Sequence, residues 1–290
     1  DFYQNGIITN LHNLRVQDTE SLEAELLAFS KVRPMGLVLP SLYSELLSPA
    51  LRNIVEELKE VKYLQQIVVG LDLATKYEYK DALNYFSKLP QNHVVLWNDG
   101  PRLKALDKKL HKLKLAPKEM GKGRNVWYCF GYILAANKVE SVALHDCDIV
   151  TYTRDMLARL IYPVANPGFN YQFCKGYYSR VSTNKINGRV CRLLVTPLIR
   201  SLMKIFPANE YLEYLNSYRY ALSGEFSLRT EVLNDIRIPS DWGLEIGVLS
   251  EMNRNYANNR ICQVDIADKY DHKHQELSEK DASKGLSKMS

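Results

Sequence analysis

The feature that most constrains the fold of this 290-residue chain is a regular alternation of short apolar runs with amphipathic segments. Each apolar run has the length of a buried strand, and each amphipathic segment has the period of a helix. Strands that alternate with helices are joined by right-handed crossovers and form a largely parallel sheet. The pattern therefore predicts an α/β fold. The predicted strands are Gly36–Leu39, Gln66–Gly70, His93–Trp97, Ser141–His145 and Ile261–Ile266, with a further strand or hairpin over Phe169–Tyr178.

Helix-start signals support several of the amphipathic segments. Ser48 and Pro49 match an N-cap followed by a first-turn proline, so a helix is expected from there to about Val61. The other predicted helices are Glu20–Lys31, Tyr79–Leu89, Arg102–Leu113, Asn125–Lys138, Arg189–Phe206, Tyr211–Tyr220, Thr230–Asp235 and Leu244–Ala257.

The composition is that of a soluble globular protein, with 46% hydrophobic and 24% charged residues. No apolar run approaches the roughly 18 residues needed to span a bilayer, and no basic-then-apolar leader points to secretion. The five cysteines are scattered and include no Cys-x-x-Cys pair, which argues against a disulfide framework or a structural zinc site. We therefore expect a cytoplasmic protein.

Positive charge is concentrated in one segment. Residues 101–124 hold nine Lys or Arg and two acids, a local charge of +7, which leaves −2 for the rest of a chain whose net charge is +5. Two interpretations stay open: a solvated helix and loop, or a positive field that attracts an anionic substrate. Nucleic-acid binding is disfavoured because the segment lacks interleaved aromatics and matches no recognition motif.

Asp146 and Asp148 directly follow the apolar run Val142–Leu144. In extended backbone, residues two apart point to the same side, and a hard divalent cation prefers oxygen ligands. An Asp-x-Asp after a buried strand is typical of the diphosphate–metal site of nucleotide-sugar glycosyltransferases. Alone it is a weak signal, because most such triplets are solvated turns.

Polar, turn-forming stretches also follow the other predicted strands of the first half. In an open α/β sheet, ligands bind beyond the carboxyl ends of the strands. Each stretch alone is an ordinary strand-to-helix loop, but together they have the layout of a nucleotide-sugar site. Asp72 is a candidate for binding a base or a ribose hydroxyl. The stretches are Pro40–Glu45, Gly70–Asp72, Asn98–Gly100 and Asp146–Asp148.

Two glycine-containing stretches precede predicted helices. Gly121-Lys122-Gly123 would let the backbone and free helix N–H groups approach an anion, with Lys122 at a diphosphate. The spacing is not that of a Walker A loop. Gly188-Arg189 suits a phosphate or carboxylate in the same way. A flexible loop with a surface cation is the alternative for both.

Further acids lie beside glycines in Ser223–Phe226 and Asp241–Glu245. In isolation they are N-caps and first-turn acids favoured by the helix dipole. His272 and His274 follow the last predicted strand, and a His pair of this kind is more often a pair of exposed surface residues than a metal site.

Taken in order from about Gly36 to Gln275, these motifs resemble the glucosyl-3-phosphoglycerate synthases, retaining glycosyltransferases of the GT-A fold. The most specific part is Ser223-Gly224-Glu225 followed by Gly243-Leu244-Glu245-Ile246-Gly247. The resemblance implies a Rossmann-like, mostly parallel sheet flanked by helices, with a C-terminal helical acceptor region.

The resemblance also implies roles for individual residues. Metal binding falls to Asp148 and His272. Glu225 and Glu245 lie at the sugar and the acceptor and are the candidate catalytic residues. The expected nucleotide-sugar contacts are Pro40, Leu42, Glu45, Asp72, Lys122, Asp146 and Asp148, and the expected acceptor contacts are Gly188, Arg189 and Val190.

The implied reaction is metal-dependent transfer of a hexose, with Mg²⁺ or Mn²⁺, from UDP- or GDP-glucose to an anionic acceptor such as 3-phosphoglycerate. The implied assembly is a homodimer with no nucleic-acid partner and no membrane span. We divide the chain into an N-terminal arm (1–33), a nucleotide-sugar-binding half (34–150), an acceptor-binding half of the same domain (151–275) and a polar tail (276–290).

Three departures from the family pattern leave the donor nucleotide and the acceptor open. Tyr43 stands where the family has Asn, Cys191 where it has Thr, and Ile186-Asn187 where it has a glycine pair. A mannosyl-3-phosphoglycerate-type or polysaccharide acceptor is an alternative. A nucleotidyltransferase is excluded, because 41–45 lacks a Gly-rich Arg loop after the first strand. A non-catalytic binding module that uses residues 101–124 is the alternative from another class.

Overall fold

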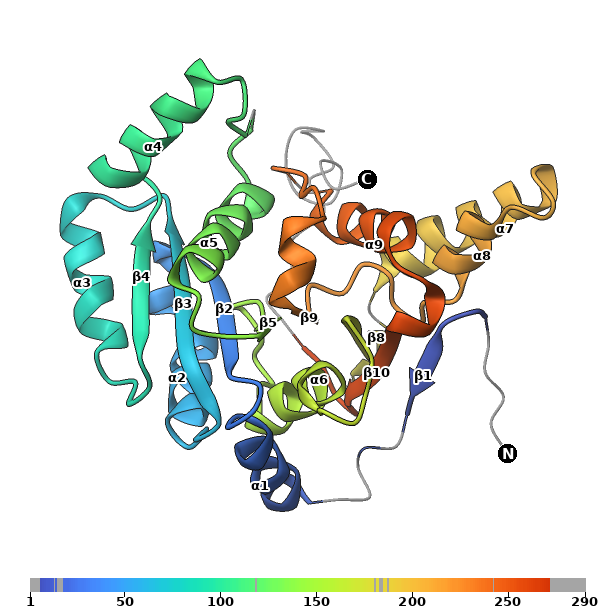
Figure 1. Ribbon diagram of the computed structural model, residues 1–290, viewed down its shortest axis with the longest axis horizontal. Coiled ribbons are helices and arrows are strands. Elements are labelled where there is room, and N and C mark those ends of the chain that lie inside the picture. The colour runs from blue at the N-terminus through green and yellow to red at the C-terminus, as the bar shows by residue number, and fades with distance from the viewer. Residues whose placement is uncertain are drawn as a thin grey trace.

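The computed structural model describes residues 6–12, 14, 18–117, 119–179, 181–182, 185–186, 188–241 and 243–271. Its centre is an eight-stranded sheet with the order β1-β10-β6-β9-β5-β2-β3-β4 (Figure 1). A two-stranded ribbon, β7 (Val181–Ser182) with β8 (Lys185–Ile186), lies outside this sheet. The sheet strands are β1 (Thr9–Leu11), β2 (Met35–Leu42), β3 (Leu64–Asp72), β4 (His93–Trp97), β5 (Ser141–Leu144), β6 (Phe173–Tyr178), β9 (Phe226–Arg229) and β10 (Ile261–Ala267).

The strand directions confirm the predicted, largely parallel sheet. Strands β4, β3, β2 and β5 are parallel neighbours, as are β6, β10 and β1. Within the described sheet, β9 alone runs antiparallel to both of its neighbours, β5 and β6. The carboxyl ends of β2, β3, β4 and β5 consequently meet at one edge, where the sequence places most of its polar strand-end residues.

Helices cover both faces of the sheet because successive strand residues point to opposite sides. Leu37 and Leu39 of β2 pack in one cluster with residues of α1, α2, α3 and α6, whereas Val38 packs in the other with residues of α5, α8 and α9. Helix α4 stands beyond the β4 end of the sheet, and α7 lies at the opposite end (Figure 1). The helices are α1 (Thr19–Phe29), α2 (Pro49–Lys59), α3 (Lys76–Phe86), α4 (Pro101–Lys112), α5 (Lys122–Ala136), α6 (Arg154–Ala165), α7 (Thr196–Ile205), α8 (Glu210–Asn216) and α9 (Leu244–Asn255), with short helical segments η2 (Tyr43–Leu47), η3 (Cys191–Val195), η4 (Thr230–Asn234) and η5 (Asn258–Arg260).

Strand β2 is longer than predicted, since it continues through Pro40 to Leu42. Its pairing with β5 ends at Val38, whereas its pairing with β3 runs to the end of the strand. Pro40 therefore lies where β2 has a neighbour on one side only, and a proline is tolerated at such a position.

Helix α6 and strand β9 were not predicted. Nine of the twelve residues of α6 are buried, and Pro163, a residue that disfavours a helix interior, lies inside it. The predicted helix over 189–206 is instead a π-helical segment, η3, followed by α7. Helix α5 begins at Lys122, three residues earlier than predicted, with Gly121 as its N-cap.

All five cysteines are free and buried, which confirms the expectation that they form no disulfide framework. In the part of the chain that the structure describes, no helix combines the length and apolarity needed to cross a bilayer.

Candidate active site

The two carboxylates of the Asp-x-Asp triplet lie just past the end of β5. The strand ends at Leu144, one residue before the predicted end, and the triplet follows in a turn. Cys147 is buried, whereas Asp146 and Asp148 are half-buried, so the two aspartates share the more open side. The alternation of a strand, on which the prediction relied, does not apply here, because the residues after Leu144 are not in the strand.

Lys122 joins three segments that are far apart in the sequence. Its Nζ lies 2.7 Å from Oδ1 and 3.0 Å from Oδ2 of Asp146, and 3.0 Å from Oε1 of Glu245 in the first turn of α9. Burial lowers the pKa of the Lys122 ammonium, but the two carboxylates act more strongly in the opposite direction, so its pKa is raised and it stays charged.

Gly224 packs directly against this ion-pair cluster. A Cβ at residue 224 would lie 2.4 Å from Oδ2 of Asp146 and 2.9 Å from Nζ of Lys122, closer than any side chain tolerates. The Ser223-Gly224-Glu225 stretch can approach the Asp-x-Asp turn only because its middle residue has no side chain.

The glycines beside Lys122 have a different function from the one predicted. A Cβ on Gly123 would lie 1.8 Å from the Pro239 carbonyl, and one on Gly121 would lie 3.0 Å from the Ser240 carbonyl. The backbone N–H of Arg124 donates to that same Ser240 carbonyl at 3.0 Å. The expectation that these glycines open the helix start to an anion is therefore wrong, because the glycines make room for the chain at 239–241.

Asp148 is the carboxylate with the most perturbed ionisation. Burial raises its pKa to about 7, and the charge of Asp146 adds to this, with smaller contributions from Glu225 and Glu45. Crowded carboxylates that resist ionisation are a good environment for a divalent cation, whose charge removes the repulsion. The donor set therefore fits a hard metal ion.

The second predicted metal ligand, His272, lies outside the described residues. The described chain ends beside the Asp-x-Asp turn, because the Val150 N–H donates to the Asp271 carbonyl at 2.8 Å and the Asp271 N–H donates to Oγ1 of Thr151 at 3.0 Å. Over the described ranges, no group of three or more His, Cys, Asp or Glu residues forms a metal cage.

Glu225 is fully buried next to this turn. The Tyr270 hydroxyl donates to its Oε1 at 2.7 Å, whereas its Oε2 has no hydrogen-bond partner among the described residues. Burial raises the pKa of Glu225, and the charge of Asp146 adds to the increase. Hydrogen bonds of the Glu225 side chain to Tyr270 and Tyr178 oppose this increase in pKa, and they offset part of the cost of burying the carboxylate.

The residues predicted to bind the nucleotide lie at the ends of β2 and β3. Asp72 is buried, and its Oδ1 accepts from Nδ2 of Asn98 at 2.8 Å and lies 3.5 Å from Nη2 of Arg124. Burial raises the pKa of Asp72. Tyr43, at one of the positions that depart from the family pattern, donates to Oδ2 of Asp81 at 3.0 Å.

The remaining predicted nucleotide contacts also lie at this edge. Pro40 and Leu42 end β2, and the Leu42 side chain is exposed. Glu45 follows in η2, and its Oε2 is buried with no partner among the described residues. These three residues therefore lie within one short segment, and Glu45 faces the same negative cluster as Asp148.

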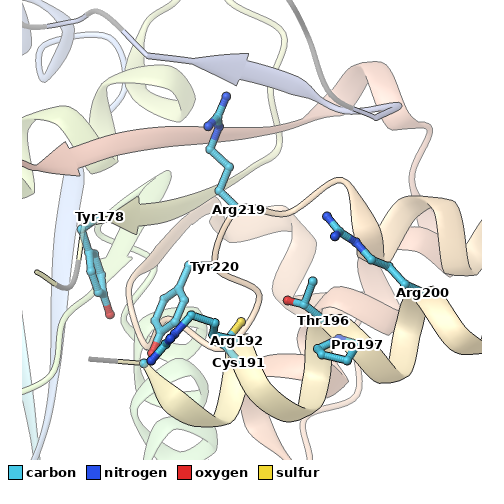
Figure 2. A pocket seen from close by; sticks show the side chains of 9 residues that line it. Tyr178, Cys191, Arg192, Thr196, Pro197, Arg200, Arg219 and Tyr220 are labelled. Atoms are coloured by element: carbon cyan, nitrogen blue, oxygen red, sulfur yellow. The ribbon is translucent and has the colours of Figure 1, made fainter. Parts of the chain in front are cut away.

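A cavity of about 560 Å³ opens between the end of β6 and the start of η3 and α7 (Figure 2). Tyr178 and Tyr220 form one part of its wall, and their rings lie 5.3 Å apart. Gly188 of the predicted acceptor motif lines it, whereas Arg189 and Val190 are not among its lining residues. The remaining lining residues are Cys191, Arg192, Thr196, Pro197, Arg200 and Arg219.

The lining of this cavity has one sign of charge. Arg192 and Arg200 contribute cations, and no described acid lines it. Arg219 also lines it, but its guanidinium lies over the Tyr177 ring, 5.5 Å from the ring centre, and points away from Tyr220 (Figure 2). Sequence reasoning missed these arginines, because none lies in a motif and Arg219 is distant in the sequence from Arg192 and Arg200. It also missed Tyr270 and Lys175, although a lysine inside the apolar run Phe173–Tyr178 was a signal that could have been noticed.

The fold is GT-A-like. A solved structure of the glucosyl-3-phosphoglycerate synthase of Mycobacterium tuberculosis, in complex with Mn²⁺, UDP-glucose and phosphoglyceric acid, superposes with a TM-score of 0.67 over 94% of this chain and 82% of that chain. At 21% identity, that likeness establishes the fold.

Sequence comparison establishes the family. The glucosyl-3-phosphoglycerate synthase of Persephonella marina is 49% identical over 289 residues, which are 100% of this chain and 71% of that protein. The enzyme of the same name from Methanococcoides burtonii is 41% identical over 293 residues, 100% of this chain and 70% of that protein. No protein-family model matches the chain. The chain belongs to the glucosyl-3-phosphoglycerate synthase family and is a glycosyltransferase.

Proposed function

We propose that this glycosyltransferase moves glucose from a nucleoside diphosphate glucose to a small acceptor that carries a phosphate or carboxylate, such as 3-phosphoglycerate. The observation that carries the proposal is the cluster of Asp146, Asp148, Glu225 and Glu245 around Lys122 at the carboxyl edge of the sheet. The two relatives named above are glucosyl-3-phosphoglycerate synthases, and the M. tuberculosis enzyme binds UDP-glucose, Mn²⁺ and phosphoglyceric acid.

Cleavage of the anomeric C–O bond leaves negative charge on the departing nucleoside diphosphate. When bound by Asp148 and His272, Mg²⁺ or Mn²⁺ would supply the positive charge that stabilises this leaving group. Lys122 adds a fixed ammonium beside the same site, held in place by Asp146 and Glu245. These residues thereby stabilise the charge that develops in the transition state more than the charge of the bound donor.

At the nucleotide end of the site, Asp72 would accept a hydrogen bond from a base or a ribose hydroxyl. Asn98 and Arg124 hold its Oδ1, which orients the carboxylate before the ligand binds. Both uridine and guanosine stay candidates for the donor nucleotide.

Glu225 is suited to orient the glucose. Its Oε2 lacks a partner among the described residues, and a sugar hydroxyl is a donor that satisfies such an oxygen. Retention of configuration and a homodimeric assembly follow from the family resemblance and stay predictions.

The acceptor would bind in the arginine-lined cavity. Arg192 and Arg200 give this cavity a positive potential that favours an anionic acceptor over a neutral polysaccharide end. A bound acceptor lies beside Tyr178, which also belongs to the aromatic group around Glu225. Acceptor and sugar would therefore meet across this short distance, where orientation lowers the barrier to transfer.

The test is a transfer assay with UDP-glucose and GDP-glucose, with and without Mn²⁺, using 3-phosphoglycerate and a neutral sugar as alternative acceptors. We expect metal-dependent transfer to 3-phosphoglycerate and none to the neutral sugar. Asp148→Ala should abolish the metal-dependent rate while leaving the protein folded. Wild-type activity of D148A in Mn²⁺, or transfer to the neutral acceptor alone, would contradict the proposal.

A further inference from the structure

Lys175 is the only buried lysine or arginine in the described part of the chain, with 1% of its surface exposed. Fully buried lysines are rare unless they are paired. No carboxylate of the described residues forms an ion pair with it. Its Nζ instead donates to the Ser223 carbonyl at 2.6 Å and lies 5.6 Å from the centre of the Phe226 ring. A charge retained in this environment calls for a reason beyond stability.

The Ser223 carbonyl belongs to the stretch that carries Gly224 and Glu225. Two further hydrogen bonds tie this stretch to β6 next to Lys175: Oγ of Ser223 donates to the Gly176 carbonyl at 2.5 Å, and the Gly176 N–H donates to the Glu225 carbonyl at 2.9 Å. Of these three hydrogen bonds, the one from Lys175 is made by a side chain of β6, whereas the other two involve the backbone of Gly176.

The position of this stretch sets the geometry of the whole site. Gly224 lies against Asp146 and Lys122 with no space to spare, so a shift of the stretch toward or away from them changes the ion-pair cluster. Glu225 moves with it, since its backbone is bonded to Gly176. The ammonium of Lys175 also lies in the field of Glu225 and Glu245, which oppose the effect of burial on its pKa.

We propose that Lys175 is a positioning residue of the transfer reaction: its ammonium holds the Ser223 carbonyl and thereby fixes Glu225 toward the sugar. The inference rests on the proposed function, because it assumes that Glu225 faces the donor glucose. Lys175 touches no reacting atom. Its effect is therefore expected on the glucose end of the donor and on kcat, and not on the nucleotide end.

The test compares Lys175→Met with Ser227→Ala. Ser227 is a matched control because it is also buried and follows the Ser223 stretch closely, whereas its Oγ donates to the Leu160 carbonyl of α6 at 2.6 Å and not to that stretch. We expect K175M to lower kcat by about 10- to 100-fold, the range found when a reacting group is misplaced by about 1 Å. S227A should lower the melting temperature and leave kcat within about twofold.

A binding measurement separates this inference from the proposed function. Calorimetry with Mn²⁺ compares two ligands, the nucleoside diphosphate and the nucleoside diphosphate glucose. K175M should bind the first as tightly as wild type does. Wild type should bind the second more tightly than the first, and K175M should lose most of this difference. If wild type transfers nothing to 3-phosphoglycerate, the proposed acceptor is wrong, and this binding difference still tests Lys175.

A second variant covers the case in which K175M does not fold. Lys175→Gln removes the charge and keeps a polar end, but its side chain is one atom shorter than that of lysine and should not reach the Ser223 carbonyl. The same loss of kcat at unchanged nucleoside diphosphate affinity is expected. A folded K175M or K175Q with wild-type kcat and wild-type affinity for the glucose donor would overturn the inference, as would an equal loss of kcat in S227A.

Discussion

Replacing Gly224 by alanine is the sharpest perturbation that the site offers. The backbone of Gly224 is not in the left-handed region, since the positive-φ glycines in the described chain are Gly6 and Gly188. Alanine can therefore adopt the same backbone, and any effect comes from the added methyl group. That methyl group would lie 2.4 Å from Oδ2 of Asp146 and 2.9 Å from Nζ of Lys122.

The size of the effect follows from these distances. Real side chains essentially never come closer than 3.0 Å, so the Asp146 carboxylate must retreat by at least 3.0 − 2.4 = 0.6 Å. The retreat strains its 2.7 Å contact with Lys122. Since a misplacement of about 1 Å costs on the order of 100-fold in rate, we expect kcat/KM to fall by about 10- to 100-fold. The unfolding free energy should fall by roughly 1–3 kcal/mol, the cost of weakening a charged hydrogen bond.

The assay is steady-state transfer with Mn²⁺, together with a urea melt. Gly131→Ala is the matched control, because Gly131 lies in α5 and an added Cβ there has no atom within 4 Å. G131A should keep wild-type activity and gain up to about 1 kcal/mol of stability from the better helix propensity of alanine. If G224A keeps wild-type kcat/KM, Asp146 and Lys122 are not held in the arrangement on which this reasoning depends.

Three further outcomes are expected. Arg200→Ala should raise the KM for 3-phosphoglycerate by about tenfold, the value of one charge-assisted hydrogen bond, and an equal rise in the KM for the donor would contradict an acceptor role. Leu73 has a φ of 53° and is 68% exposed, so Leu73→Gly should raise the unfolding free energy in urea by roughly 1 kcal/mol, and a loss of stability would show that the side chain makes a contact worth more than the strain. Burial lowers the pKa of Lys175 to about 8, below the unfolded value of about 10.4. Between these two pH values the unfolded chain binds more protons than the folded chain, so the free energy of unfolding rises with pH. As the pH rises from about 8 to about 10.4, the free energy of unfolding of wild type should therefore increase by up to about 3 kcal/mol relative to that of K175M. A difference between the two proteins that is constant across this pH range would mean that Lys175 is not the group that titrates.

Local signals were sufficient to predict the nucleotide half of the fold. The strand over His93–Trp97 matches β4, and Ser48 caps α2 through Leu51, because an apolar run and a cap are each determined by a few neighbouring residues. Helix α6 was missed for the opposite reason. Pro163 argues locally against a helix, and nine buried residues of α6 show that the helix depends on the tertiary packing around it.

In the site, too, some features follow from local motifs and others depend on the tertiary structure. Asp146 and Lys122 were named from motifs, but nothing in the sequence indicates that they form an ion pair with each other and with Glu245. Arg192 and Arg200 of the cavity belong to one continuous helical stretch, but only the fold brings Arg219 and the tyrosines beside them. The glycines beside Lys122 were misinterpreted because the same small residue serves a ligand or a neighbouring chain, and only the structure distinguishes the two.

The charges of the site explain why donor and metal are expected to bind together. Five carboxylates, those of Asp146, Asp148, Glu225, Glu245 and Glu45, surround the ammonium groups of Lys122 and Lys175, which gives a formal charge of −5 + 2 = −3. The imbalance is consistent with the raised pKa values of Asp148 and Glu225. A divalent cation offsets two of these negative charges, whereas a nucleoside diphosphate alone would add to the repulsion. Nucleotide affinity that does not depend on Mn²⁺ would therefore mean that the diphosphate avoids this cluster.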